Sequence, residues 1–116
     1  MARVFLRIDF APGSRVGPGK IALLEQIDHT GSISAAGRAL GMSYRRAWVL
    51  VDELNRMFAS PVVTTQLGGS RGGGAALTDL GTDLVARFRA LEQAVGALTD
   101  EHLGRFEAMA TKAAQP

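Results

Sequence analysis

The sequence predicts a mainly α protein with a small β-sheet, organised as a winged helix-turn-helix with a long C-terminal dimerisation helix. Two helical patterns meet at Gly41, and a glycine-rich loop lies between two strand patterns over residues 62–78. A regular apolar seam then runs along residues 79–110. We therefore expect a DNA-binding domain over 1–78, a dimerisation helix or helices over 79–110 and a frayed tail over 111–116.

Length and composition are those of one ordinary globular domain. The chain has 116 residues, of which 47% are hydrophobic and 21% charged, so global disorder is not expected. The net charge is only +2, but residues 29–78 carry five arginines and two carboxylates, whereas residues 79–116 carry four basic and six acidic side chains. The positive excess therefore lies on the segment expected to read DNA, and the acidic C-terminal third should face away from DNA.

Several classes of site are absent from the sequence. The chain has no cysteine, which excludes disulfides, thiolate catalysis and cysteine-based zinc sites. His29 and His102 lie far apart and are interpreted as surface residues. No nucleophile with an adjacent base and no paired carboxylates in an apolar setting are visible, so we expect neither an enzyme nor a cofactor. No run is apolar enough to span a bilayer and no signal peptide is visible, so we expect a cytoplasmic protein without a membrane partner.

The first element expected is a β-strand over residues 3–10. Its apolar residues alternate with other side chains and predict one buried face: Val4, Leu6, Ile8 and Phe10. Turn-forming residues over 11–19 end this strand. A helix should follow over 18–29, because proline suits a first helical turn. Its apolar residues recur at helical spacing and should be buried: Ile21, Leu23, Leu24 and Ile27.

Residues 30–58 predict two helices joined by a tight turn. Ser32 is placed to cap a short helix over 33–40, and Ser43 is placed to cap a second helix over 44–58. Gly41 supplies the positive φ that ends the first helix. Three small residues should let the two helices cross closely: Ala35, Ala36 and Ala39.

The second helix has a buried stripe and an exposed face. The stripe follows from a rotation of about 100° per residue and contains Ala47, Leu50, Val51, Leu54 and Phe58. Its exposed first turn carries a serine, a tyrosine and two arginines over 43–46, with no acidic residue over 38–50. A recognition helix presents such residues to base edges and phosphates, so we predict binding to double-stranded DNA. The alternative is a three-helix core whose arginines are merely solvated.

Residues 62–78 predict a wing. Pro61 ends the second helix, β-branched residues follow over 62–66, and the glycine loop LGGSRGGGA over 67–75 carries Arg71 near its tip before the chain returns. Such a loop can approach a phosphodiester chain closely, and its arginine can enter the minor groove. A plain hairpin is the alternative. A nucleotide-phosphate cradle is disfavoured, because the Gly-Lys-Ser/Thr ending of a P-loop is missing.

A long helix should begin after Thr78, its predicted cap. Apolar residues recur along it at spacings of four, three, four and three: Leu84, Phe88, Leu91, Val95 and Leu98. This narrow seam is typical of a helix with one partner helix, so we predict that it forms a homodimer. Packing on the chain's own core is the alternative. Residues 96–100 predict a break in the helix, followed by a last amphipathic turn or two.

Two stretches of the chain resemble the N-terminal DNA-binding domain of ModE-type molybdate-responsive regulators: GKIALLEQIDHTGSISAAGRALGMSYRRAWVLVDELN and GGSRGGGAALTDLG. That domain is a winged helix related to the one in LysR-type regulators. The resemblance covers about residues 3–96 and implies a homodimer on a palindromic operator, with a reading helix over 43–55. Together with the arginine pattern it gives these candidate DNA-binding residues: Ser32, Arg38, Ser43, Tyr44, Arg45, Arg46, Trp48, Arg56 and Arg71.

The candidate residues have different expected roles. We expect Arg45 to read guanine, which arginine binds through two hydrogen bonds, and Arg38, Arg46 and Arg56 to contact phosphates. ModE-type regulators carry C-terminal molybdate-binding domains, and this sequence ends before such domains, so molybdate sensing is not expected from these residues. Two alternatives to a DNA-binding regulator stay open: a protein-interaction module, and an oxyanion-responsive subunit that uses a separate sensor.

Overall fold

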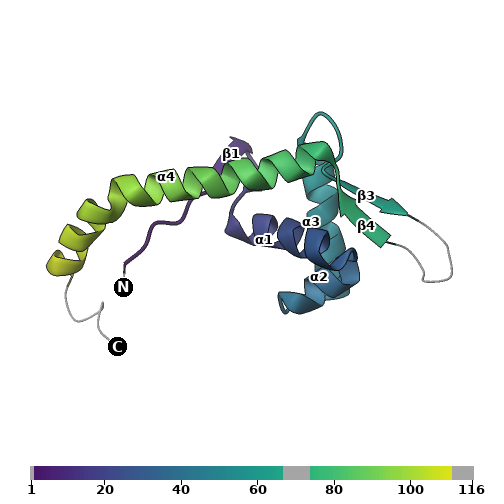
Figure 1. Cartoon of the computed structure of the whole chain (residues 1–116), viewed down its shortest axis with the longest axis horizontal. Helices are drawn as coiled ribbons and strands as arrows, with labels where there is room; N and C mark the ends of the chain where they lie inside the picture. The colour runs from purple at the N-terminus through teal and green to yellow at the C-terminus, as the bar shows by residue number, and fades with distance from the viewer. Residues whose placement is uncertain (1, 67–73, 111–116) are drawn as a thin grey trace.

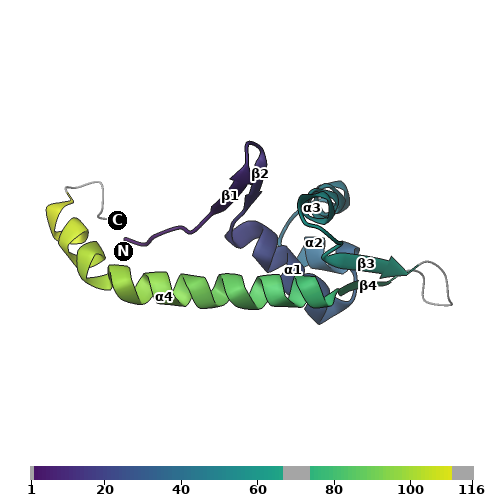
Figure 2. The same ribbon diagram turned by 90° about the horizontal axis from the view of Figure 1, so that it is seen from above.

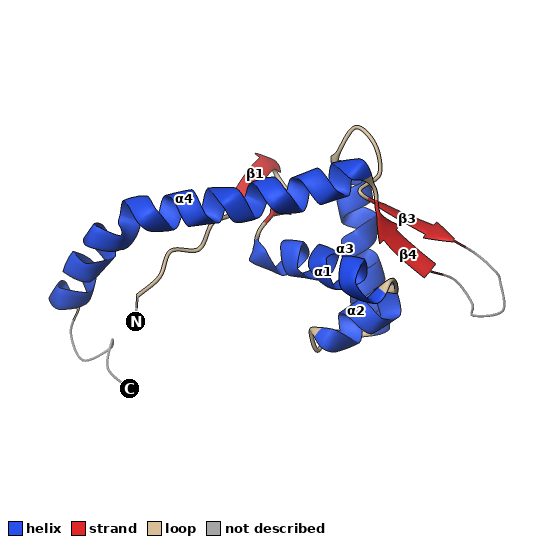
Figure 3. Ribbon diagram, viewed as in Figure 1, coloured by secondary structure: helices blue, strands red, loops and turns tan. Residues whose placement is uncertain are grey.

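A computed structural model describes residues 2–66 and 74–110 of the chain (Figure 1). The fold is mostly helical, with two small antiparallel sheets and a long C-terminal helix, as Figure 3 shows by its colouring. The expected single small sheet is thus replaced by two separate hairpins. The elements are β1 (Ile8–Ala11), β2 (Ser14–Val16), α1 (Pro18–Thr30), α2 (Ile33–Ala39), α3 (Tyr44–Met57), β3 (Val63–Gln66), β4 (Gly74–Leu77) and α4 (Asp79–Met109).

The first hairpin corrects the expected N-terminal strand. The prediction of a strand over 3–10 is wrong in its extent, because β1 covers only Ile8–Ala11. β1 pairs with β2 across a turn at Gly13, whose φ of +83° is readily adopted only by glycine. Residues 3–7 find no partner strand in the described part of the chain, and a strand needs a neighbour for its backbone hydrogen bonds. Val4, expected to be buried, is 47% exposed.

Helix α1 lies at the centre of the hydrophobic core. The predicted buried face is confirmed, since four side chains have no solvent exposure: Ile21, Leu23, Leu24 and Ile27. Pro18 stands in the first turn, and Gly31 ends the helix at a φ of +72°. The core around α1 is completed by apolar side chains from other elements: Val16, Ile33, Ala36, Ala47, Leu50, Val51, Leu54, Val62, Val63 and Phe88.

Helices α2 and α3 cross at Gly37. A Cβ atom added at Gly37 would lie 2.9 Å from the Cβ of Ala47, so only glycine allows this approach without a shift. Ala36 is buried as expected, but Ala39 is exposed, and its predicted part in the crossing is wrong because α2 ends at that residue. The positive φ predicted for Gly41 is confirmed at +69°.

Helix α4 runs without interruption over Asp79–Met109, which is 31 residues. The predicted break over 96–100 is therefore wrong. Thr99 donates a hydrogen bond from its hydroxyl to the Val95 carbonyl oxygen at 2.8 Å, a contact that is compatible with helix and often bends it. Figure 1 shows the last turns of α4 curving away from the axis of the first turns.

Only the first half of α4 packs on the core. Phe88 is 2% exposed and belongs to the core cluster, and Leu84 packs against that cluster. Beyond this half, Figures 1 and 2 show α4 projecting past α1, with the N-terminal segment running beside it toward the helix end. The long helix accounts for a longest dimension of 57 Å.

Candidate nucleic-acid interface

The first turn of α3 is capped by Ser43 and is exposed to solvent. The Ser43 hydroxyl oxygen accepts a hydrogen bond from the Arg46 backbone N–H at 3.0 Å, as the sequence predicted. The predicted buried stripe of α3 is confirmed except at Phe58, which is only partly buried and follows the last helical residue. The stripe turns the opposite face outward: Ala47, Val51 and Leu54 are at most 2% exposed, whereas Arg45, Arg46 and Val49 are exposed. The helix thus presents a row of side chains that nothing in the described chain covers.

Two arginines on this face have no acidic partner among the residues that the structure describes. Within residues 2–66 and 74–110, no salt bridge involves Arg45 or Arg46, and both guanidinium groups are available to an anion. Two further arginines expected to contact DNA, Arg38 and Arg56, already have intramolecular partners. Arg56 forms an ion pair with Asp52 at 3.1 Å, one helical turn away, and Arg38 donates a hydrogen bond to the Ser34 hydroxyl at 2.8 Å.

An aromatic pair lies on one flank of the same helix. The Tyr44 and Trp48 rings meet edge to face, with 6.1 Å between centroids, and the side chains are 60% and 38% exposed. They line a hollow of about 250 Å³ between α3, the start of α2 and the β3–β4 hairpin, to which Thr65 and Gln66 contribute. Aromatic rings and hydroxyl groups in one hollow can contact both sugars and base edges.

The β3–β4 hairpin is tied to α3 by Asn55, which the sequence did not single out. Its Oδ1 atom accepts hydrogen bonds from the backbone N–H groups of Val62 and Val63, at 2.8 and 3.0 Å, and its amide nitrogen donates to the Val63 carbonyl at 3.1 Å. Only the position of Asn55, shortly before Pro61 breaks the helix, could have suggested such a role. The side chain fixes the hairpin beside α3.

A second tie joins this hairpin to the turn between α1 and α2. The Ala75 backbone N–H donates to the Gly31 carbonyl at 2.9 Å. Thr78, the predicted cap of α4, accepts from the Gly81 N–H at 3.0 Å and donates its hydroxyl to the Pro61 carbonyl at 2.8 Å. Together with the Asn55 contacts, these hydrogen bonds fix the β3–β4 hairpin relative to α3 and to the start of α4.

Arg71 and Ser32 are two further candidates for DNA contacts. Arg71 and the loop around it, over 67–73, lie outside the residues that the structure describes. Ser32 caps α2 as predicted, since its hydroxyl accepts from the Ala35 N–H at 3.1 Å, and it also lines the aromatic hollow. Of the nine candidates, the structure brings Ser32, Tyr44 and Trp48 to one hollow.

Comparison with known proteins gives matches over most of this chain. It is 49% identical over 86 residues to the molybdenum-pterin-binding protein MopB of Rhodobacter capsulatus, which covers 74% of this chain and 32% of that protein. It is 40% identical over 92 residues to the molybdenum transport protein ModE of Azotobacter vinelandii, covering 79% and 33%. It is 34% identical over 92 residues to the DNA-binding transcriptional dual regulator ModE of Escherichia coli (strain K12), covering 79% and 35%. The chain has homologues among the ModE and Mop proteins.

The chain spans about a third of the length of these ModE and Mop relatives. The names differ in what they describe: ModE of Escherichia coli is a DNA-binding regulator, and MopB is a molybdenum-pterin-binding protein, and neither name describes an enzyme. No family model matches the chain.

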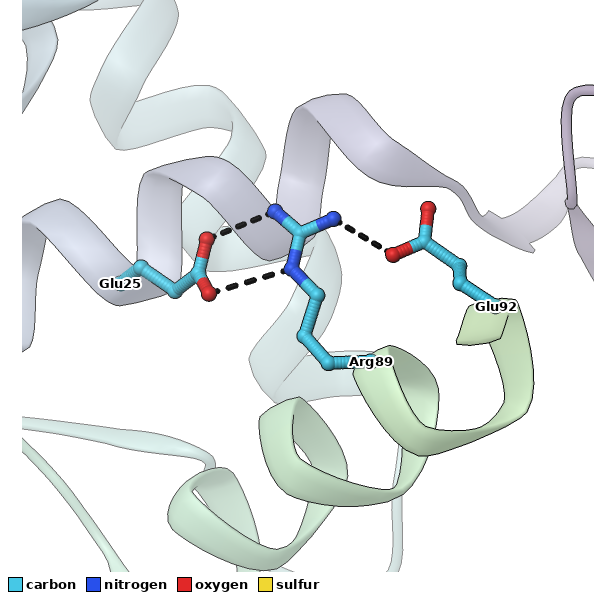
Figure 4. A network of polar contacts seen from close by, with 3 residues as sticks. All are labelled: Glu25, Arg89 and Glu92. Atoms are coloured by element: carbon cyan, nitrogen blue, oxygen red, sulfur yellow. Dashed lines mark hydrogen bonds and ion pairs between the residues drawn. The ribbon is translucent and has the colours of Figure 1, made fainter. Parts of the chain in front are cut away.

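A bidentate polar contact joins two distant segments of the chain (Figure 4). Arg89 of α4 donates to both carboxylate oxygens of Glu25 on α1, at 2.7 and 3.1 Å, and to Glu92 at 2.7 Å. The guanidinium group lowers the pKa of the Glu25 carboxyl, and the two carboxylates raise the pKa of Arg89 above its ordinary value. No sequence pattern predicts this pairing, because the two residues are 64 positions apart.

Other kinds of site are not seen in the described ranges. There, no three histidine, aspartate or glutamate side chains are grouped to hold a metal ion. No helix in residues 2–66 or 74–110 combines the length and hydrophobicity needed to cross a membrane.

Proposed function

We propose that this chain binds double-stranded DNA as a homodimer and regulates transcription from a palindromic operator. In this proposal, residues 1–78 form a winged helix-turn-helix, with α2 and α3 as its helices and the β3–β4 hairpin as its wing, and residues 79–110 form the dimerisation unit. The observation that carries the proposal is the exposed first turn of α3, where Arg45 and Arg46 have no acidic partner within the described residues.

The shape of α3 supports its role as reading helix. An α-helix with side chains is about 10–12 Å across, which fits a major groove about 12 Å wide. Arg45, Val49 and Asp52 form the stripe opposite the buried residues, so this stripe would meet base edges. Arg45 is our candidate for guanine readout, because its guanidinium can donate to O6 and N7 together. The similarity to a relative named as a DNA-binding regulator agrees with this role.

Exposed apolar side chains along α4 support the proposed dimer. Several apolar side chains of α4 from Leu91 onward are exposed: Leu91 at 42%, Leu98 at 78%, Phe106 at 61% and Met109 at 69%. Leu84 and Phe88 pack on the chain's own core, which was the alternative to a dimer contact, because α1 lies beneath this part of α4. The dimer contact we propose therefore uses Leu91, Val95 and Leu98 of the predicted seam.

A two-fold dimer sets a geometric expectation for the operator. Its half-sites should be centred about one helical turn of DNA apart, ~34–36 Å, or a multiple of that distance. In this proposal, the position of the dimer contact along α4 would set the distance between the two reading helices and therefore the spacing that is bound.

The direct test is a fluorescence-anisotropy titration with a duplex selected from a random library and with a scrambled duplex, at two salt concentrations. We expect tight, salt-sensitive binding and a clear preference for the selected duplex. Arg87→Ala serves as a control variant, because Arg87 lies on α4, is 80% exposed and pairs with Asp83 away from α3. Equal weak binding to both duplexes, or none, would overturn the proposal in favour of a protein-interaction module.

An oxyanion-binding function is the second candidate, and the name of MopB favours it. Molybdate binding to the folded state would raise the melting temperature of the protein in proportion to the logarithm of its concentration. A molybdate-dependent shift, with sulfate as the control anion, would support this candidate. No shift with molybdate, alongside specific DNA binding, would exclude it for this chain.

A further inference from the structure

A second hollow, larger than the aromatic one, lies on the other flank of α3. It has a volume of about 540 Å³ and is formed by the β1–β2 hairpin, the start of α1 and α3. We call it the basic hollow, because four of its lining side chains are cations, Arg7, Arg15, Lys20 and Arg46, against one carboxylate, Glu53.

Helical geometry places the two hollows on opposite sides of α3. At about 100° per residue, Arg46 and Leu50 lie roughly 120–160° around the axis from Tyr44 and Trp48. The first pair lines the basic hollow and the second pair lines the aromatic hollow. Arg45 lies between them, on the face proposed to meet base edges. A helix seated in the major groove would therefore direct each hollow at one of the two phosphate chains that bound the groove.

Two of the four cations that line the basic hollow, Arg7 and Lys20, form ion pairs with carboxylates. Arg7 pairs with Asp9 at 2.8 Å, and Lys20 pairs with Glu53 at 3.3 Å and donates to the Arg15 carbonyl at 2.7 Å. Within the described ranges, no carboxylate forms an ion pair with Arg15 or Arg46. These two guanidinium groups, from the hairpin and from α3, are the unpaired charges on the lining.

The hairpin is in a position to meet the same duplex as α3. Figure 2 shows β1–β2 and α3 projecting from the same side of the molecule, away from α4. Three glycines also line the hollow and place no side chain on its surface: Gly13 at the turn of the hairpin, and Gly17 and Gly19 at the start of α1. A phosphate chain could therefore approach Arg15 without meeting bulky side chains at these positions.

We propose that the basic hollow seats a DNA backbone phosphate on the flank of α3 opposite the β3–β4 hairpin, held by Arg15 together with Arg46. Lys20 and Arg7 add positive potential around that phosphate. The proposal rests on the proposed DNA binding and adds the N-terminal hairpin to its contact surface. The hollow and the β3–β4 hairpin then grip the two phosphate chains on either side of the reading helix.

The test measures the salt dependence of duplex binding for wild type, Arg15→Ala and Arg15→Lys, with Arg87→Ala as the matched control. Loss of one phosphate contact should reduce the slope of log K against log salt by about 0.9 and weaken binding to the selected and scrambled duplexes alike. Arg15→Lys should keep most of the slope, because lysine also binds phosphate as a point charge. Circular dichroism and thermal melting check that each variant is folded.

The outcomes separate the two proposals. If wild type binds DNA and Arg15→Ala has the slope of Arg87→Ala, the phosphate seat is overturned while the proposed function stands. If wild type shows no salt-dependent DNA binding, both are overturned. If inorganic phosphate or molybdate raises the melting temperature of wild type but not of Arg15→Ala, and the DNA slopes are equal, the hollow is a site for a free oxyanion and not for the DNA backbone.

Discussion

Arg89 on α4 donates two hydrogen bonds to the Glu25 carboxylate on α1. In the described residues, no polar contact between α4 and α1 lies further along α4 than this one. The contact is bidentate, which fixes direction as well as distance. Since α4 is proposed to carry the dimer contact and α1 supports the proposed DNA-reading helices, this pair helps to set the angle between dimer axis and reading helix.

Glu25→Gln should lower the free energy of unfolding by about 0.5–1 kcal/mol at neutral pH, a modest value because both side chains are more than a third exposed and screened by solvent. The folded-state pKa of Glu25 lies below its ordinary value of 4.5, so the stabilisation is fully present above pH 4.5 and is lost as pH falls through the folded-state pKa. Urea unfolding at several pH values measures the difference between wild type and variant, which should shrink in acid. A difference that stays constant below pH 4.5 would contradict the assignment. Asp83→Asn, which breaks an exposed pair one turn apart on α4, is the control and should cost about 0.3–0.5 kcal/mol.

Gly81→Ala should be strongly destabilising. An added Cβ would clash with the Val62 carbonyl oxygen, and this backbone atom also accepts a hydrogen bond from the Thr78 N–H, so it has little freedom to move. We expect a loss of at least about 2 kcal/mol in chemical unfolding. Gly104→Ala in the same helix meets nothing within 4 Å and should stabilise by about 0.5–1 kcal/mol. Similar effects of the two variants would refute the close approach of α4 to the Val62 backbone just before β3.

Arg45→Ala and Arg46→Ala should weaken DNA binding in different ways. If Arg45 reads guanine, its loss should reduce discrimination by about 1–3 kcal/mol at one base position, while affinity for random DNA changes little. Arg46→Ala should weaken both duplexes alike and reduce the salt slope by about one. Anisotropy titrations with operator and random duplexes separate these outcomes. Equal losses on both duplexes for Arg45→Ala would show a phosphate contact instead.

Leu98→Asp and Phe88→Ala should separate association from folding. Leu98 is 78% exposed, so Leu98→Asp should leave the melting temperature of the monomer nearly unchanged and dissociate the proposed dimer. Phe88 is 2% exposed, and Phe88→Ala should cost about 3–5 kcal/mol of unfolding free energy by leaving a cavity. Sedimentation velocity and chemical unfolding report the two properties. A Leu98→Asp protein that sediments as wild type does would exclude this part of α4 from the dimer contact.

The helix boundaries could be predicted because their causes are local. Ser32, Ser43 and Thr78 each accept a hydrogen bond from an N–H three residues ahead, and Gly31 and Gly41 each end a helix with a positive φ. The buried stripes of α1 and α3 were also predicted correctly, since one side of an amphipathic helix must face the core.

The errors fall where a distant partner decides the outcome. The strand pattern over 3–10 holds only where β2 pairs with it. Gly96, Thr99 and Asp100, on which the predicted break of α4 rested, do not interrupt the helix. The small residue at the helix crossing is Gly37, because the position of Ala47 on the other helix selects which residue must lack a side chain.

By itself, the sequence determined the order of helices, their ends, their buried faces and the exposed arginines at the start of α3, because these depend on hydrogen bonds and periodicity within a few residues. Three contacts depend on the tertiary structure alone: Asn55 anchors the β3–β4 hairpin, Arg89 reaches Glu25, and Arg15 and Arg46 line one hollow. Such contacts join segments that are not neighbours in the chain, and no local pattern records which side chains the packing of the core will bring together.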